Sequence, residues 1–183
     1  NYTWNLKNGK DSKLSKYHIS DNYIRFYLKY IAPYKTQIDR NNFEFTSLAI
    51  LPGWDIIIAL QFENLVLNNK QFLWQLLDIN PVDIRTENPF FQRKTIRQIG
   101  CQIDYLIQTK FGSLYICEIK FSKHKIPYSI IAEVQQRISA LQKPKHLSCH
   151  PVLVHVNGVD ASVIESGYFA KIIDFSAAFN CII

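Results

Sequence analysis

Apolar residues recur at helical spacing in three segments of the chain, which we therefore predict to be helices. The first segment spans 21–32, and Asp21 is placed to cap it. The second segment, 54–67, follows a Pro-Gly break and has the length and apolar content of a buried helix. The third segment begins at Pro127 and ends near 141. Its apolar stripe consists of Ile130, Val134, Ile138 and Leu141.

Strands are predicted where apolar residues alternate with polar ones or form short unbroken runs. The segments 94–107 and 113–121 are joined by a turn at Gly112 and should pair as neighbours. The run 151–156 is typical of a buried strand. The apolar end of the chain, 168–183, should pack as a final strand and helix. A helix, a strand pair, a crossover helix and a further strand together predict an α/β domain with a mixed β-sheet flanked by helices.

The first twenty residues are polar and rich in lysine, and they predict a loose hairpin around Gly9 with strands at 2–6 and 16–19. The segments 72–77 and 81–91 have no clear period, so their type stays open.

Charge and composition are compatible with a nucleic-acid-binding protein and argue against zinc-binding, disulfide-rich, membrane and secreted proteins. The net charge of +6 is compatible with an anionic partner such as nucleic acid. The four cysteines form no C-x-x-C pair, so neither a zinc site nor a disulfide framework is indicated. No apolar run approaches the roughly 18 to 20 residues that span a bilayer, and the N-terminal residues lack the apolar stretch of a secretory signal. We therefore expect a soluble, cytoplasmic protein with no membrane partner.

Three charged residues interrupt the predicted strand pair. Side chains alternate across a strand, so Gln102, Asp104 and Leu106 should share one face. On the neighbouring strand Glu118 and Lys120 likewise share one face. Pairing of the strands would therefore bring the three charges together. Two close carboxylates repel each other unless a divalent cation or a lysine neutralises them.

Hard cations such as Mg²⁺ are bound by one or two carboxylates together with waters and substrate phosphate oxygens. Asp104 and Glu118, with the backbone carbonyl of Ile119, fit this pattern, and Mn²⁺ is the alternative ion. Lys120 would face the same pocket, where its ammonium orients or helps to deprotonate a water, or stabilises charge on phosphorus. The set predicts metal-assisted phosphodiester hydrolysis. The structural alternative is a strand salt bridge at a sheet edge.

Two helical residues are predicted to support this site. The residues one turn away from Glu63 are all apolar, so its carboxylate lies on the apolar face of its helix and is expected to contact the metal through a water. Gln135 is expected on the face of the third helix that turns toward the sheet. The alternatives are an ordinary helix acid and an ordinary helix amide, each facing solvent.

The order and spacing of these residues resemble the PD-(D/E)xK, or restriction-endonuclease-like, nuclease superfamily. The positions that carry the resemblance are Glu63, Asp104, Glu118, Ile119, Lys120 and Gln135. The resemblance implies a mixed sheet of the restriction-endonuclease type, two strand carboxylates that bind Mg²⁺, a strand lysine that assists the water, and two helix residues that support the site. Ile103 stands where the superfamily pattern has a proline before the aspartate.

A second resemblance covers nearly the whole chain. It rests on the motifs KLSKYHISDNYIRFYLKYI, FENLV, IDYLI, CEIKFS, PVLVHVNGV and FAKIIDF. These are similar to the C-terminal region of AAA+ ATPases of the archaeal-type family, which place a nuclease-like domain after an ATPase module and a winged helix. The resemblance implies that residues 1–50 are a remnant of the winged-helix wing and a helical bridging segment, and that 51–183 are the nuclease-like domain. The chain has no G-x-x-x-x-G-K-[ST], so the ATPase module would lie outside it.

Together these observations predict a Mg²⁺- or Mn²⁺-dependent endonuclease that acts on DNA as the C-terminal part of an AAA+ ATPase. The alternative is a catalytically silent module that binds DNA or a protein partner and regulates or targets the ATPase. A homodimer is compatible with cutting both strands of a duplex. Basic residues at 93–97, 120–125 and 143–146 either line a phosphate-binding surface or form a solvated face.

Overall fold

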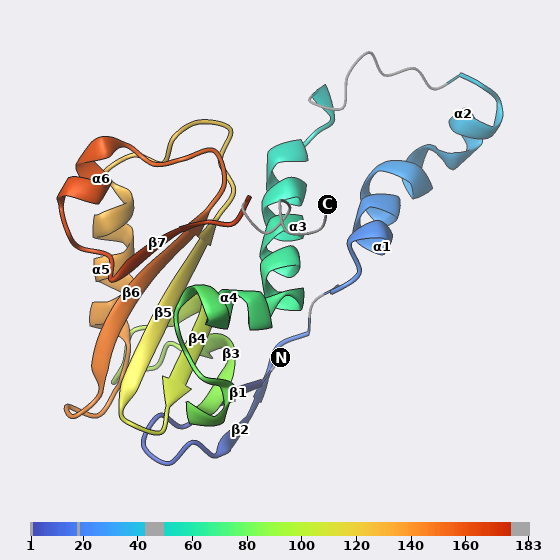
Figure 1. Ribbon diagram of the computed structural model, residues 1–183. Helices are drawn as coiled ribbons and strands as arrows, with labels where there is room; N and C mark the ends of the chain where they lie inside the picture. Colours follow the sequence, from blue (N-terminus) through green and yellow to red (C-terminus); the bar gives the residue numbers. More distant parts are fainter. Residues whose placement is uncertain (1, 18, 43–49, 177–183) are drawn as a thin grey trace.

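The computed structural model describes residues 2–17, 19–42 and 50–176, and its centre is a five-stranded sheet (Figure 1). In spatial order the strands are β3 Ile84–Gln92, β4 Cys101–Thr109, β5 Ser113–Lys120, β6 Ser148–His155 and β7 Lys171–Asp174. The first three strands pair antiparallel, whereas β6 is parallel to both β5 and β7. The predicted α/β class with a mixed sheet is therefore confirmed.

Helices cover both faces of the sheet, as Figure 1 shows. Their bounds are α3 Trp54–Asn68 and α4 Lys70–Leu76 on one face, and α5 Ile130–Ala140 and α6 Ala161–Glu165 on the other. Alternation along β6 separates the two layers. Val152 and Val154 belong to the cluster under α3 and α4, whereas Leu153 belongs to the cluster under α5 and α6. None of the described helices is long and apolar enough to cross a membrane.

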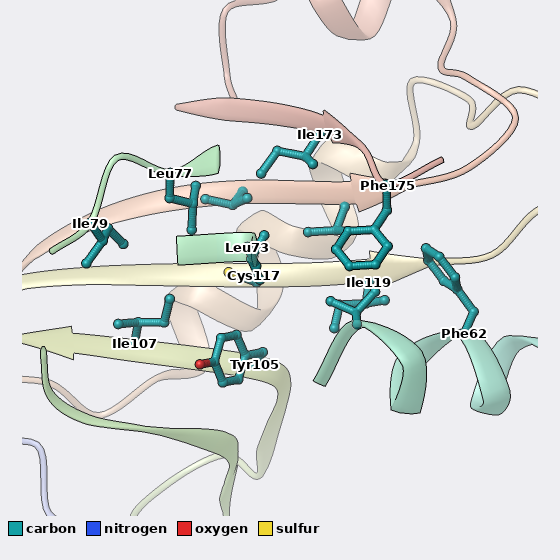
Figure 2. Packing of buried hydrophobic residues seen from close by; sticks show 13 residues of the cluster. Phe62, Leu73, Leu77, Ile79, Tyr105, Ile107, Cys117, Ile119, Ile173 and Phe175 are labelled. Carbon is teal, nitrogen blue, oxygen red and sulfur yellow. The ribbon is translucent and has the colours of Figure 1, made fainter. Parts of the chain in front are cut away.

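The main hydrophobic cluster lies between the sheet and the helices α3 and α4 (Figure 2). Phe62 of α3 and Leu73 of α4 meet Tyr105 of β4 and Ile119 of β5 in this layer. Removing this apolar surface from water, at about 25 cal/mol per Å², is what holds the helices on the sheet. It also places Glu63, the neighbour of Phe62, near the end of the sheet that carries the charged residues.

The helical predictions hold where local chemistry defines the ends. Helix α3 begins after Gly53, which has a left-handed φ of 68° that glycine adopts at little cost. Helix α1, Asn22–Phe26, is capped by Asp21, whose side chain accepts a hydrogen bond from the N–H of Ile24 at 2.8 Å. The helical path then continues through a π-helical turn and a 3-10 turn to α2. Their bounds are Tyr27–Ile31, Ala32–Tyr34 and Lys35–Asp39.

The N-terminal hairpin exists, but its second strand comes earlier in the chain than predicted. The strands are β1 Tyr2–Trp4 and β2 Asp11–Ser15, rather than a second strand at 16–19. Trp4 meets Phe90 edge to face with ring centroids 5.2 Å apart, and its indole N–H donates to Oε1 of buried Gln108 at 2.8 Å. The buried side chain of Trp4 therefore anchors the hairpin on the sheet. This contact fixes the position of β1 and, through it, the position of β2.

Two other predicted boundaries are corrected by the structure. The strand predicted over 94–107 begins at Cys101, because residues 93–100 form a tight turn between β3 and β4. The segment 81–91, whose type was open, contains most of β3, and 72–77 belongs largely to α4. Strand β7 confirms a strand within 168–183, while the helix predicted after it lies outside the described residues.

Candidate active site

The structure brings three of the predicted residues together at the end of β4 and β5. Asp104 on β4 accepts a hydrogen bond at its Oδ2 from the backbone N–H of Ile119 at 2.9 Å. On β5, the ammonium of Lys120 lies 3.2 Å from Oε1 of Glu118. Two carboxylates and one lysine from neighbouring strands therefore form a single cluster, as the strand pairing predicted.

An irregularity in the pairing of β3 and β4 determines the face of the sheet on which Asp104 lies. The register between β3 and β4 shifts across Pro89, which has no N–H to donate to the ladder, and Asp104 lies in the stretch of β4 opposite. Ile103 and Leu106 belong to the same hydrophobic cluster although they are three residues apart. The strict alternation predicted from Gln102 to Leu106 is therefore wrong here, because the shift reverses the order of faces within β4.

Helix α5 contributes two side chains that the sequence analysis did not select. The guanidinium of Arg137 forms an ion pair with Oε2 of Glu118, and its Nη1 lies 3.7 Å from Oδ1 of Asp104. One helical turn earlier, Oε2 of Glu133 lies 3.2 Å from Nζ of Lys120. The cluster therefore alternates in charge, with Arg137 joining the two carboxylates and Lys120 joining Glu118 to Glu133.

Burial makes this cluster electrostatically unusual. Glu118 is only 3% exposed. Burial, together with the charge of Asp104, raises its pKa to about 7 against the opposing effect of Arg137 and Lys120. Burial also raises the pKa of Asp104, although the Ile119 N–H and the nearby cations oppose the rise.

The same surroundings keep the lysine charged. Burial alone would lower the pKa of Lys120, but the carboxylates of Glu118 and Glu133 outweigh it and raise that pKa. The site therefore pairs a lysine that stays protonated with a carboxyl that changes its charge near neutral pH.

Glu63 adjoins this cluster. It is half-buried on α3 and lines a small neighbouring cavity of about 120 Å³ together with Lys16, Arg25 and Gln102. Burial and the charge of Asp104 raise the pKa of Glu63, which places the two carboxyl groups within electrostatic reach of each other.

Gln135 is not brought into the site. Its side chain is exposed, whereas Arg137, two residues later and about 200° around the helix, points to the carboxylates. The expectation that Gln135 faces the sheet is therefore wrong. The heptad-like spacing of Ile130, Val134 and Leu141 contains the signal that was missed, because 137 falls on the same stripe. An arginine on an otherwise apolar stripe requires an anionic partner in the sheet.

A cavity of about 430 Å³ opens beside the cluster and is lined by Asp104, Arg137, Gln136 and residues just before β4. The donor set fits a magnesium ion, because this ion commonly takes only one or two protein carboxylates and completes its shell with waters and phosphate oxygens. Among the described residues, no group of three or more His, Cys, Asp and Glu side chains is placed to hold a metal by itself. An ion here would therefore depend on Asp104, Glu118 and substrate oxygens.

The chain is similar to a solved structure at low sequence identity. The crystal structure of a repair endonuclease from Pyrococcus abyssi matches with a TM-score of 0.39 and 16% sequence identity, covering 60% of this chain and 42% of that chain. The chain thus spans less than half the length of that protein. No family model matches the chain, and no curated protein does. The association with an AAA+ ATPase stays a prediction.

Proposed function

We propose that this chain is a PD-(D/E)xK-type nuclease that hydrolyses phosphodiester bonds in DNA with Mg²⁺ or Mn²⁺. The observation that carries the proposal is the clustering of Asp104, Glu118 and Lys120 on neighbouring strands, with Asp104 lining an open cavity. Buried carboxylates held this close are costly unless cations compensate them. In the nuclease, a divalent ion would take over from Lys120 and Arg137 as the counter-charge of these carboxylates and leave the two cations for the phosphodiester.

Asp104 and Glu118, with the carbonyl of Ile119, are the groups that would hold the ion, and Glu63 would contact it through a water. The bound ion would supply a Lewis acid that neutralises the phosphate and activates a water. Because its pKa is raised, Lys120 remains an ammonium at neutral pH and therefore orients a water or donates to a phosphate oxygen instead of accepting a proton.

Arg137 adds a second cation with a different role. Its guanidinium presents several N–H donors in a planar fork, a geometry that suits phosphate as well as carboxylate oxygens. Arg137 is about one-third exposed, so it can reach a substrate in the cavity without leaving α5. We assign it to charge stabilisation of the phosphate, with Glu118 as its partner in the absence of substrate.

A specific observation also favours the silent binding module. Arg137 and Lys120 together already neutralise Glu118 and Asp104 without any metal ion. In a silent module this network would serve as a structural tie between α5 and the sheet. The two functions are separated by metal binding, because only the nuclease requires Asp104 and Glu118 to exchange protein cations for a divalent ion.

The test is cleavage of supercoiled plasmid, single-stranded DNA and a branched junction in the presence of Mg²⁺ or Mn²⁺. Asp104→Asn and Lys120→Met should each abolish metal-dependent cutting. The asparagine can still accept the hydrogen bond from Ile119, so the strand geometry is preserved. Glu165→Gln and Lys171→Gln change exposed residues of α6 and β7, outside the cluster, and are the controls that should cut like wild type.

Metal binding is measured separately, by calorimetric titration of Mn²⁺ into wild type and Asp104→Asn. Cutting that survives both site variants would refute the assignment of the residues. A folded wild-type protein that neither cuts nor binds Mn²⁺ would favour the silent module.

The association with an ATPase remains part of the proposal. We propose that the chain is the C-terminal part of an AAA+ ATPase, with 51–183 as its nuclease-like domain and 1–50 as the connection from the winged helix. The support is the set of motifs that spans the chain from KLSKYHIS to FAKIIDF. Sequencing the gene upstream of Asn1 tests this directly, since an ATPase module must carry a P-loop motif.

A further inference from the structure

The turn between β3 and β4, residues 93–100, is a preformed hairpin, which we call the basic hairpin. The N–H of Thr95 donates to the carbonyl of Gln98 at 3.0 Å, and the N–H of Arg97 donates to Oγ1 of Thr95 at 3.2 Å. The amide of Gln98 reaches back to the carbonyl of Arg93 at 2.8 Å. These bonds hold the backbone of the tip in one conformation, so that binding has to order only its side chains.

The base of the basic hairpin is fastened to the rest of the domain. A side chain on Gly100 would come within 3.2 Å of the backbone nitrogen of Lys94, so the two arms approach as closely as glycine allows. The amide of Gln92 donates both to the carbonyl of Ile99 at 2.6 Å and to the carbonyl of Ala140 at the end of α5. The hairpin is thus positioned by the same helix that carries Arg137.

The surface of the basic hairpin combines positive charge with exposed apolar side chains. Arg93, Lys94 and Arg97 are exposed, and residues 93–100 contain no acid. Ile96 at the tip is completely exposed, and Ile99 is 68% exposed. Single exposed apolar residues are common on proteins, but two of them on one short turn among three cations form a distinct surface.

The basic hairpin lies between two hollows. Ile99 lines the 430 Å³ cavity that also contains Asp104. On its other side, Arg93 lines a hollow of about 390 Å³ together with Lys7 and Lys143. None of the described residues that line this second hollow is acidic. A polyanion that crosses the hairpin would therefore run from a cationic hollow to the carboxylate cluster.

We propose that the basic hairpin holds duplex DNA across the candidate site, with its three cations on backbone phosphates and Ile96 against the base stack. This inference rests on the proposed function and narrows its substrate class to duplex DNA. Phosphate contacts supply sequence-independent affinity and fix the register of the duplex. Apolar side chains inserted at a base step unstack it, so the tip can open the duplex next to the bond to be cut. An acidic protein could also bind the three cations of the basic hairpin, but it would leave the adjoining carboxylate cluster without a function.

The charge part is tested by fluorescence anisotropy of a short labelled duplex at several salt concentrations, in the presence of a chelator. Each lost phosphate contact should lower the slope of log affinity against log salt by about 0.9. The double variant Lys94→Gln, Arg97→Gln should therefore lower the slope by about 1.8. Lys171→Gln removes an exposed lysine at the far edge of the sheet and should leave the slope unchanged. An unchanged slope in the double variant would overturn the proposal.

The apolar part is tested with 2-aminopurine placed in the duplex, whose fluorescence rises when its base step is unstacked. Wild type should raise the fluorescence, and Ile96→Ala should lose most of that rise while its salt slope stays the same. Ile164→Ala, an exposed isoleucine on α6, is the matched control. A rise of equal size in wild type and Ile96→Ala would refute the insertion of Ile96.

These outcomes separate the hairpin from the hydrolysis. Binding is measured without metal, so loss of affinity in the hairpin variants supports the hairpin even if wild type never cuts. Metal-dependent cutting with an unaltered salt slope would overturn the hairpin and leave the nuclease intact. Tighter binding of single strands than of duplex would overturn the assignment of duplex DNA.

Discussion

Arg137 allows the electrostatics of the cluster to be tested by its pH dependence. The variant Arg137→Met keeps the aliphatic stem but removes the cation that pairs with Glu118 and lies near Asp104. Breaking a fully buried pair in this way costs about 3–5 kcal/mol. Because the Arg137 side chain is 32% exposed, water screens part of the interaction, and we expect a loss of about 2 kcal/mol at pH 8.

The sign of the pH dependence follows from the pKa of Glu118. This pKa rises from the ordinary 4.5 to about 7 on folding, so the folded state binds the proton more tightly than the unfolded state. In wild type, the stability contributed by Glu118 is present at low pH and is lost as the pH rises toward about 7. In Arg137→Met the pKa rises further, so the loss of stability continues above pH 7.

The size of the effect follows from the same values. At about pH 8, wild type is one unit above its Glu118 pKa, and each unit corresponds to about 1.4 kcal/mol. If the higher pKa keeps Glu118 of Arg137→Met protonated up to pH 8, the stability difference from wild type should be larger at pH 8 than at pH 5.5 by roughly 1 kcal/mol. At pH 5.5 Glu118 is protonated in both proteins, so removal of the Arg137 cation costs less stability.

The assay is urea unfolding followed by the fluorescence of the three tryptophans, at both pH values. Arg137→Lys should recover part of the stability because it keeps the charge but not the fork. Arg97→Met, which removes an exposed arginine of the basic hairpin, is the control and should change stability by less than about 0.5 kcal/mol. A loss in Arg137→Met that is equal at both pH values, or no loss, would refute the buried ion pair with Glu118.

Three further predictions concern stability. Leu73 of α4 is fully buried against the sheet, so Leu73→Ala should lower the free energy of unfolding, measured in urea, by about 2–5 kcal/mol, and a loss below about 1 kcal/mol would contradict the packing. Trp4→Phe leaves the buried amide of Gln108 without a donor and should cost about 1–3 kcal/mol, less when combined with Gln108→Leu. Asp21→Ala removes the cap on the Ile24 N–H and should cost about 1 kcal/mol, seen as faster hydrogen exchange in α1.

Local patterns were sufficient to predict most of the elements. The positions of α3 and α5 follow from apolar residues at helical spacing, and the β4–β5 pair follows from alternating strands around Gly112. Pairing of two strands joined by a short turn is a local event, so the meeting of Asp104 with Glu118 and Lys120 could also be predicted. The turn at 93–100 was not predicted, because a tight turn with few glycines has a sequence similar to that of the strands on either side.

What the sequence by itself determined was which residues lie on the paired strands and on the inner stripe of each helix, whereas the tertiary structure decided which residues of distant elements contact each other. The apolar stripe of α5 turns Arg137 toward the sheet, but the packing of α5 on the sheet decides which carboxylates it meets. The placement of Asp104 depends on a register shift across Pro89. The raised pKa of Glu118 depends on depth and on charges contributed by β4 and α5. Desolvation and Coulomb energy depend on burial and distance through space, and these are set by the packing of distant segments.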